Sequence, residues 1–190
     1  MYEGTDVLRN LPGIRYGAEL AAVEAELTAR RIALLANNPI EGSYDLVHLQ
    51  AFHRHLFDGL YEWAGQLRTV PIAKTEMFCL PQHIETYSDQ VFAELARERQ
   101  LKGLGRTAFV KRAAHFLGEV NAIHPFRDGN GRTQRAFFSH LAAGADHHLA
   151  WERVSQERNS EAFVASHRGD NQPLEALIGA VTEPLKRTRD

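Results

Sequence analysis

Apolar residues recur every three or four positions over most of the chain, which is the spacing that one buried face of an α-helix requires. The clearest run follows Ser43, and its apolar members are Leu46, Leu49, Phe52, Leu56 and Leu60. Ser43 is suited to cap this helix, and Asp45 would then lie in the first turn, facing the positive helix end. The same spacing predicts six further helices, over about 18–37, 81–99, 107–120, 131–141, 159–168 and 173–186. Pro81 suits a first helical position, and Thr107 is expected to cap the helix that begins there.

One stretch does not have helical spacing. Residues 67–80 are rich in β-branched and aromatic side chains and contain Pro71, a composition that favours short strands. We predict a β-hairpin that turns around 74–76, although the turn lacks the Gly or Asn of the tightest hairpins. An isolated hairpin is only marginally stable, so it must lean on the helices. The predicted fold is an all-α domain with one β-hairpin on its surface.

Composition narrows the class of protein. The 190 residues fit a single domain over 1–190, and 44% hydrophobic with 24% charged residues excludes a disordered or collagen-like chain. The net charge of −2 gives no argument for direct nucleic-acid binding or for an anionic membrane surface. The lone Cys79 fits a reducing compartment, and there is no export signal or membrane-spanning run. We therefore expect a cytoplasmic protein, while delivery to another cell by a secretion system that ignores N-terminal signals would leave no trace here.

Residues 124–135, His-Pro-Phe-Arg-Asp-Gly-Asn-Gly-Arg-Thr-Gln-Arg, contain most of the chemistry. The segment Gly129–Gly131 cannot extend a helix comfortably, but it can present consecutive N–H groups to an anion. The next predicted helix begins at the same point, so its positive end adds to the attraction. Arg132 and Arg135 lie three apart on one helical face, and their guanidinium groups match phosphate oxygens. The segment is therefore predicted to bind a polyphosphate.

Two side chains of this segment are candidates for catalysis. Asp128 is its only carboxylate, and one carboxylate together with phosphate oxygens and water is a usual way to hold Mg²⁺. The alternative is that Asp128 neutralises nearby arginines. His124 has an ordinary pKa suited to general-base chemistry, the alternative being a capping or core histidine. Phe126 is expected to anchor the segment in the core.

The segment resembles the signature of the Fic family, His-x-Phe-x-Asp/Glu-Gly-Asn-Gly-Arg-x-x-Arg, and matches it at every fixed position. Residues 45–65 and the 67–80 hairpin also resemble the helix and the "flap" that precede this signature, so the similarity covers about 5–185. It implies an all-α Fic fold and transfer of AMP from ATP to a hydroxyl group of a target protein. A related branch that transfers phosphate has Lys where this chain has Gly131, which favours AMP transfer here.

The resemblance also implies roles for single residues. His124 would deprotonate the target side chain, and Asp128 would hold Mg²⁺ between the α- and β-phosphates. The residues implied to bind ATP or its phosphates are Arg127, Gly129, Asn130, Gly131, Arg132 and Arg135. The flap would align an extended target segment by main-chain pairing. Its expected contacts with target or nucleotide are Lys74, Thr75, Met77 and Phe78, and the alternative is a hairpin with no role beyond the surface.

Other functions compete with this interpretation. Ten histidines raise the question of a metal site, but His53 and His55 lie on different helical faces, and no His-Glu-x-x-His occurs. A nucleotide-binding module without catalysis predicts a damaged base or metal ligand, whereas this chain keeps His124 and Asp128. A Fic enzyme that transfers another phosphate-containing group is the third alternative.

The expected partners of this chain are implied only by its resemblance to the Fic family. Short Fic proteins resemble bacterial toxins, some of which modify type II topoisomerase subunits, so such subunits are candidate targets. Fic proteins are often inhibited by a helix that carries Ser/Thr-x-x-x-Glu-Gly/Asn, whose Glu pairs with the second signature arginine, Arg135 here. No Ser or Thr of this chain has Glu four residues later, and Ser166 has only Asp170. We therefore expect inhibition in trans by a small antitoxin that carries this helix.

Overall fold

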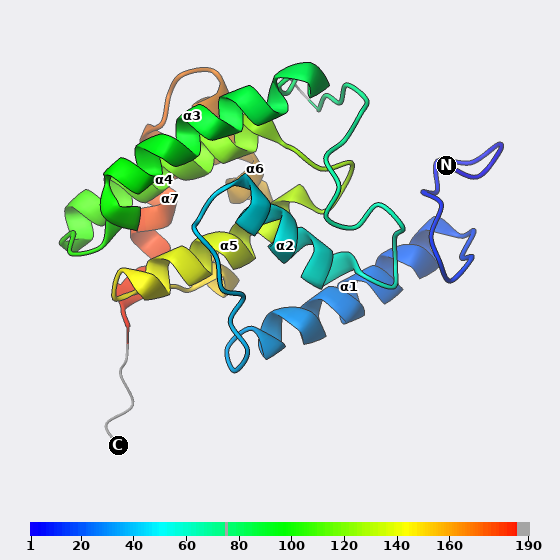
Figure 1. Ribbon diagram of the computed structural model, residues 1–190, viewed down its shortest axis with the longest axis horizontal. Coiled ribbons are helices and arrows are strands. Elements are labelled where there is room, and N and C mark those ends of the chain that lie inside the picture. The colour runs from blue at the N-terminus through cyan, green and yellow to red at the C-terminus, as the bar shows by residue number, and fades with distance from the viewer. Residues whose placement is uncertain (75, 186–190) are drawn as a thin grey trace.

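The computed structural model describes residues 1–74 and 76–185, and in them the chain is mainly helical (Figure 1). The α-helices are α1 (Gly17–Leu34), α2 (Leu46–Phe57), α3 (Ile84–Arg97), α4 (Arg106–Ile123), α5 (Asn130–Gly144), α6 (Gln156–His167) and α7 (Gln172–Val181). The short 3₁₀ helices are η1 (Pro81–His83), η2 (Arg99–Leu101) and η3 (Trp151–Arg153). Two strands, β1 (His147–Leu149) and β2 (Thr182–Pro184), complete the fold. None of the helices in these ranges is long and apolar enough to cross a membrane.

The core lies between α2, α3, α4 and α5. Helices α3 and α4 run side by side, α5 packs against both α2 and α4, and α6 and α7 cover another side of α4. Aromatic rings fill the centre, and the fully buried ones are Phe52, Phe57, Tyr61, Phe109, Phe116, Phe126, Phe137 and Phe138. Phe126 thus anchors the 124–135 segment in the core, as predicted.

Helix α1 lies along the outside of this core, beside α2 (Figure 1). It buries only a narrow stripe, Leu20, Glu24 and Thr28. Two of these three are polar, and an apolar pattern cannot reveal them as inward-facing residues. Glu24 is also one of the residues that line the cavity of the protein.

All seven predicted helices are present, with corrections at their ends. Asp45, not Ser43, caps α2, and its side chain accepts a hydrogen bond from the His48 N–H at 2.8 Å. The residue before α4 is Gly105, so Thr107 already lies inside the helix. The last helix ends at Val181 instead of continuing to 186, because the chain turns into β2 there; residue 186 lies outside the described residues.

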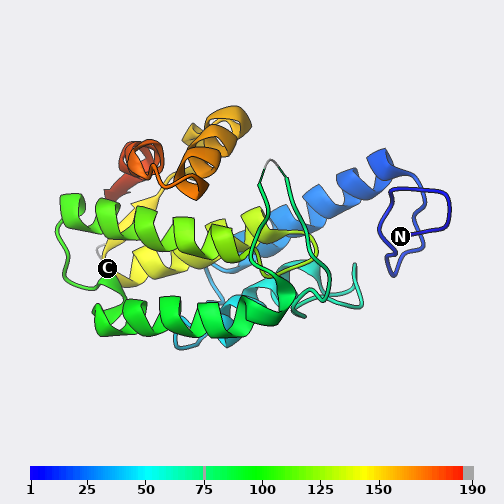
Figure 2. The ribbon, with the colours of Figure 1, turned by 90° about the horizontal axis from the view of Figure 1, so that it is seen from above.

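The predicted hairpin and the observed sheet are different parts of the chain. The sheet is β1 paired antiparallel with β2, His147 opposite Pro184, and strands of three residues are too short to recognise by alternation. Residues 67–80, hereafter the flap, form one isolated antiparallel bridge between Ala73 and Met77. Figure 2 shows the flap as a long narrow loop beside the ends of α4 and α5. A hairpin is therefore present at the predicted place, but a single bridge replaces the two predicted strands.

Candidate active site

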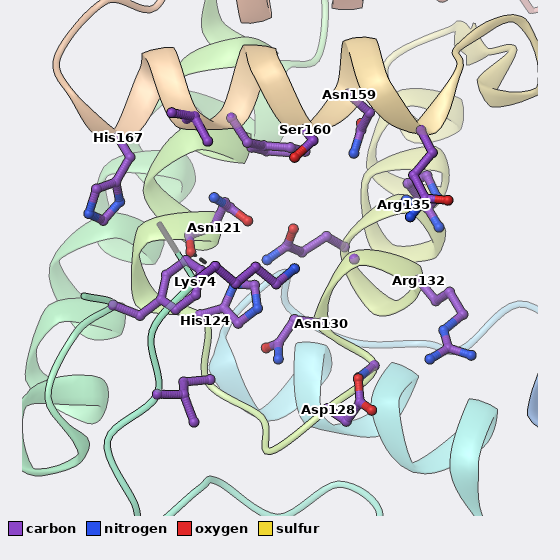
Figure 3. A pocket seen from close by; sticks show the side chains of 18 of the residues that line it. Lys74, Asn121, His124, Asp128, Asn130, Arg132, Arg135, Asn159, Ser160 and His167 are labelled. Atoms are coloured by element: carbon purple, nitrogen blue, oxygen red, sulfur yellow. Dashed lines mark hydrogen bonds between the residues drawn. The ribbon is translucent and has the colours of Figure 1, made fainter. Parts of the chain in front are cut away.

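The 124–135 segment, hereafter the signature loop, joins α4 to α5 and faces a cavity of about 1210 Å³. The flap forms one wall of this cavity, and α6 covers it from the opposite side (Figure 3). From α6, Asn159, Ser160 and His167 point toward His124 and Arg135. Segments far apart in the sequence therefore enclose one polar space.

His124 directly follows α4 as its C-cap and has a left-handed backbone, φ 47° and ψ 61°. Pro125 disfavours the right-handed helical conformation at this position, which ends the helix. The His124 ring lies 3.2 Å, measured from Nδ1, from the Asn121 carbonyl oxygen. A carbonyl only accepts, so Nδ1 carries the proton, and Nε2 is the basic nitrogen. Strained backbone of this kind concentrates at functional sites.

The surroundings of His124 keep its imidazole neutral. Burial, the positive charges of Lys74 and Arg68, and nearby His167 together lower its pKa to about 3, while the hydrogen bond to Asn121 acts in the other direction. The Phe78 ring of the flap stacks on the imidazole, with the centroids 3.8 Å apart. A neutral imidazole with a free Nε2 can accept a proton at physiological pH.

Two side chains fix the backbone of the signature loop. The Asn130 amide accepts from the Phe126 N–H at 3.0 Å and donates to the Phe126 carbonyl at 2.8 Å. His53 of α2, fully buried, donates from Nε2 to the Asp128 carbonyl at 3.0 Å and accepts the Gly65 N–H on Nδ1 at 2.8 Å. These two bonds hold the Asn130 side chain against Phe126, and the Asn130 backbone N–H lies in the first turn of α5.

Asp128 is exposed at the rim of the cavity. Its Oδ1 accepts the Gly129 N–H at 2.6 Å. Within the described residues Asp128 forms no ion pair. A solvent-exposed carboxylate with one oxygen free fits a Mg²⁺ ligand shared with phosphates. No group of three or more potential metal ligands occurs in the described part of the chain.

The turn into α5 requires glycine at 129. Gly129 has φ 76°, and a Cβ on it would lie 2.3 Å from the Phe57 ring. Thr133 closes the first turn, its N–H and hydroxyl both donating to the Gly129 carbonyl at 3.0 Å. The N–H groups of Asn130, Gly131 and Arg132 begin the helix and have no carbonyl one turn earlier within it. Free N–H groups of this kind at a helix N-terminus can bind an anion.

The two signature arginines have different surroundings. Arg132 donates to Glu24 of α1, whose other oxygen accepts the Tyr61 hydroxyl. Arg132 also lies over the Phe57 ring at 5.0 Å. Arg135 forms no hydrogen bond or ion pair within the described residues, and burial together with Arg132 lowers its pKa. Arg135 is thus the guanidinium that is free to bind an incoming phosphate.

The structure places most of the predicted site residues on this cavity. Its lining includes His124, Arg127, Asp128, Gly129, Asn130, Gly131, Arg132 and Arg135, together with Lys74 and Phe78 of the flap. Met77 is 56% exposed and does not line it, and the predicted contact Thr75 lies outside the described residues.

Several residues of the site were not predicted from the sequence. Glu24 binds Arg132 and also accepts the Tyr61 hydroxyl. His53 holds the Asp128 backbone, and Arg68 contacts the His124 carbonyl. From the sequence alone, His53 is considered only as a metal ligand. A buried polar residue on an otherwise apolar helical face, as at His53, is the one signal that would have indicated them.

Comparison with known proteins agrees with this arrangement. The model of the Fic/DOC family matches residues 43–142. The protein adenylyltransferase VbhT of Bartonella schoenbuchensis is 41% identical over 175 residues, which is 92% of this chain but 37% of VbhT. The probable protein adenylyltransferase Fic of Escherichia coli K12 is 36% identical over 182 residues, covering 95% of this chain and 90% of that protein. The chain therefore belongs to the Fic/DOC family.

The fold is shared with solved Fic structures. The BepC protein of Bartonella tribocorum, crystallised with bound AMPPNP, superposes on this chain with a TM-score of 0.91 at 26% identity. The match covers 98% of this chain and 97% of the BepC chain. The N-terminal Fic domain of a Bartonella quintana effector with bound ADP has a TM-score of 0.88 at 28% identity, covering 97% of this chain and 94% of its own. The predicted family and the mostly helical Fic fold are confirmed.

Proposed function

We propose that this chain is a protein adenylyltransferase that moves AMP from ATP to a hydroxyl side chain of a target protein. The observation that carries the proposal is the placement of a neutral His124, basic at Nε2, beside the N-terminus of α5 in one cavity. A base next to an anion site is what nucleotidyl transfer to a hydroxyl requires. The relatives named as protein adenylyltransferases support the same reaction.

The proposed step is a single displacement at the α-phosphorus. The target hydroxyl oxygen forms a bond to the α-phosphorus, and the bond from that phosphorus to the oxygen bridging to the β-phosphate breaks. His124 Nε2 takes the hydroxyl proton, and diphosphate leaves. The products are the AMP-modified protein and diphosphate, so atoms and charge balance without another reactant.

The signature loop would bind the phosphates. The first N–H groups of α5 would face them together with Arg135, which has no ion-pair partner in the described residues, and Arg127 lines the same cavity. Arg132, already bound to Glu24, would add its charge from the side. Asp128 would hold Mg²⁺, which neutralises charge on the phosphates and on the departing diphosphate when bound.

The flap would present the target. Its tip bears Lys74 at the cavity and the exposed Met77 outside it, and a single bridge leaves most of its main-chain groups available to pair with an extended segment. Type II topoisomerase subunits remain candidate targets by family analogy only.

Inhibition in trans is the regulation we propose. The Ser/Thr-x-x-x-Glu pattern is missing from this chain, and Arg135 has no carboxylate partner in the described residues. A small antitoxin helix with such a Glu would pair with Arg135 and compete with the γ-phosphate for it. Expressing the chain with and without its genomic neighbour, and measuring growth and ATP labelling, tests this point.

Labelled ATP, Mg²⁺ and a bacterial lysate provide the direct test of activity. We expect the wild-type chain to label a protein, with the mass of AMP added to Ser, Thr or Tyr in the mass spectrum. His124→Ala should cut labelling by about 100-fold or more and keep ATP binding, whereas His148→Ala, on the exposed middle of β1, should change neither. Binding of ATP without any labelling would instead indicate the non-catalytic module, and an added mass other than AMP the alternative transferase.

A further inference from the structure

Arg68 stands out because its guanidinium is buried without a counter-charge. The residue is 4% exposed, and it forms no ion pair among the described residues. Burial lowers its pKa, which shows that the charged form is held at a cost. A charge is retained in such a place only where hydrogen bonds compensate it, so its partners indicate what it does.

All the partners of the Arg68 side chain are backbone carbonyl oxygens. Nε donates to His124 at 2.8 Å, Nη1 to Val70 at 2.9 Å, and Nη2 to Cys79 and to Ile123, the last at 3.2 Å. Val70 and Cys79 belong to the two stems of the flap, one on each side of its tip. Ile123 and His124 belong to the turn that carries the base. One guanidinium therefore contacts both stems and the catalytic turn at once.

The main chain of the flap continues the same contact. The Arg68 N–H donates to the Pro125 carbonyl at 2.9 Å, and the Cys79 N–H donates to the Ala122 carbonyl at 3.0 Å. Four consecutive carbonyls, residues 122–125, thus accept hydrogen bonds from the flap. The last carbonyls of a helix have no partner inside it, so the flap stems cap α4 at the point where its chain turns to present His124.

We propose that Arg68 is a positioning residue that fixes the flap to the catalytic turn and thereby sets the place of a target hydroxyl relative to His124 Nε2. This inference rests on the proposed AMP transfer. A lysine cannot replace the arginine, because a single ammonium group cannot reach carbonyls in four directions, whereas the planar guanidinium fork does. A misplacement of about 1 Å at a reacting pair costs about 100-fold in rate.

Two substitutions separate position from charge. Arg68→Lys keeps the charge and loses the fork, while Arg68→Met loses both. We expect label incorporation at saturating ATP to fall by about 100-fold in Arg68→Lys, with the apparent KM for ATP unchanged. Hydrogen exchange of the flap amides, including that of Cys79, should accelerate in both variants.

The pKa of His124 is a second quantity to measure, because a general loss of stability would not change it. The charged or titratable groups that act on its ring are Lys74 from the flap tip, Arg68 from the stem and His167 from α6. Removing the positive charge in Arg68→Met should raise the pKa of His124, observed by NMR, and should move the acid limb of the activity profile to higher pH. Arg68→Lys should leave that limb in place.

Arg106 offers a matched control. Its guanidinium also donates to backbone carbonyls, those of Thr182 at 3.3 Å and Gly179 at 2.5 Å, at the opposite end of α4. Arg106→Lys should lower the melting temperature but leave flap exchange, labelling and the His124 titration as in the wild type. If Arg68→Met does not fold, Arg68→Lys decides alone.

The outcomes are separable. A folded Arg68→Lys that labels at the wild-type rate, or whose flap amides exchange as slowly as in the wild type, overturns the inference. A wild-type chain that labels nothing contradicts the proposed function instead. In that case flap exchange and the His124 titration still test whether Arg68 fixes the flap.

Discussion

The signature loop and the flap face the same cavity but are held in different ways. Side chains of its own and of α2 fix the loop: Asn130 binds both backbone groups of Phe126, and His53 binds the Asp128 carbonyl. The flap has one bridge at its tip, Ala73 with Met77, and is fixed firmly only at its stems. If the proposed function holds, the part with more side-chain contacts is the one that would bind ATP, which is the same in every reaction, and the part with fewer contacts is the one that would bind a target protein.

Among substitutions in the signature loop, we expect the largest effect from a change at Gly129. In Gly129→Ala the new Cβ would lie 2.3 Å from the Phe57 ring, in a backbone with φ 76°. We expect a loss of about 3 kcal/mol in the free energy of unfolding, from left-handed strain and overpacking together. Denaturant unfolding measures it.

Glycine 131 is the matched control for that change. Its φ is not in the left-handed region, and a Cβ there would meet only Arg135 Nη1 at 3.6 Å, an ordinary contact. Gly131→Ala should therefore unfold at or above the wild-type denaturant concentration, because Ala favours a helix over Gly. Equal losses in the two variants would mean that the turn does not select glycine for the reason given.

The sequence predicts the chemistry of the signature loop better than the contacts that hold the loop in place, because only the chemistry lies in consecutive residues. The signature loop could be inferred because its chemistry lies in consecutive residues, 124–135, and helix spacing located its flanks. The contacts that hold it come from elsewhere: Glu24 on α1 and His53 on α2 are distant in sequence, and only tertiary packing brings them to Arg132 and Asp128. No local pattern encodes such contacts.

The flap was recognised as non-helical, yet its internal pairing was overestimated. Composition favoured strands, but Arg68 takes the Val70 and Cys79 carbonyls that a regular ladder would use. The cap at Asp45 was missed by two residues for a related reason, because Ser43 and Asp45 are both good capping residues and the sequence alone does not choose between them.

Substitutions of the two signature arginines, Arg132 and Arg135, should have smaller effects within the signature loop. Arg135 has no protein partner in the described residues, so Arg135→Ala should weaken ATP binding by about 10-fold, the value of one lost hydrogen bond to a charged group, with little change in stability. Arg132→Ala should instead lower stability, because the Glu24 carboxylate, itself 7% exposed, would keep only Tyr61 as a partner. Calorimetric titration with ATP and thermal unfolding measure the two effects, and the same profile for both variants would contradict the distinction.

Lys74 tests how strongly the flap tip acts on the loop. Its positive charge lowers the pKa of His124, after burial the largest cause. The base is active when neutral, so a lowered pKa keeps it active to lower pH. Lys74→Met should raise the pKa of His124 and move the acid limb of the labelling profile toward neutral pH, while Lys111→Met, on the outer part of α4 away from the cavity, should not. An unshifted limb in Lys74→Met would show that the flap tip does not act on His124 in solution.

The smallest effect is expected where the flap tip meets α6. Arg168 donates to Glu76 Oε1 from Nε at 3.1 Å and from Nη2 at 2.9 Å, and the two side chains are 59% and 43% exposed. An exposed ion pair contributes about 0–1 kcal/mol, so Glu76→Gln should change the melting temperature very little. Because this ion pair joins the flap to the end of α6 at the cavity, its loss should still alter labelling of a protein target by about twofold, a change of some 0.4 kcal/mol, and leave ATP binding unchanged. A stability loss as large as that of Gly129→Ala would mean that the tip is as firmly fixed as the signature loop, and the contrast between the two regions would not hold.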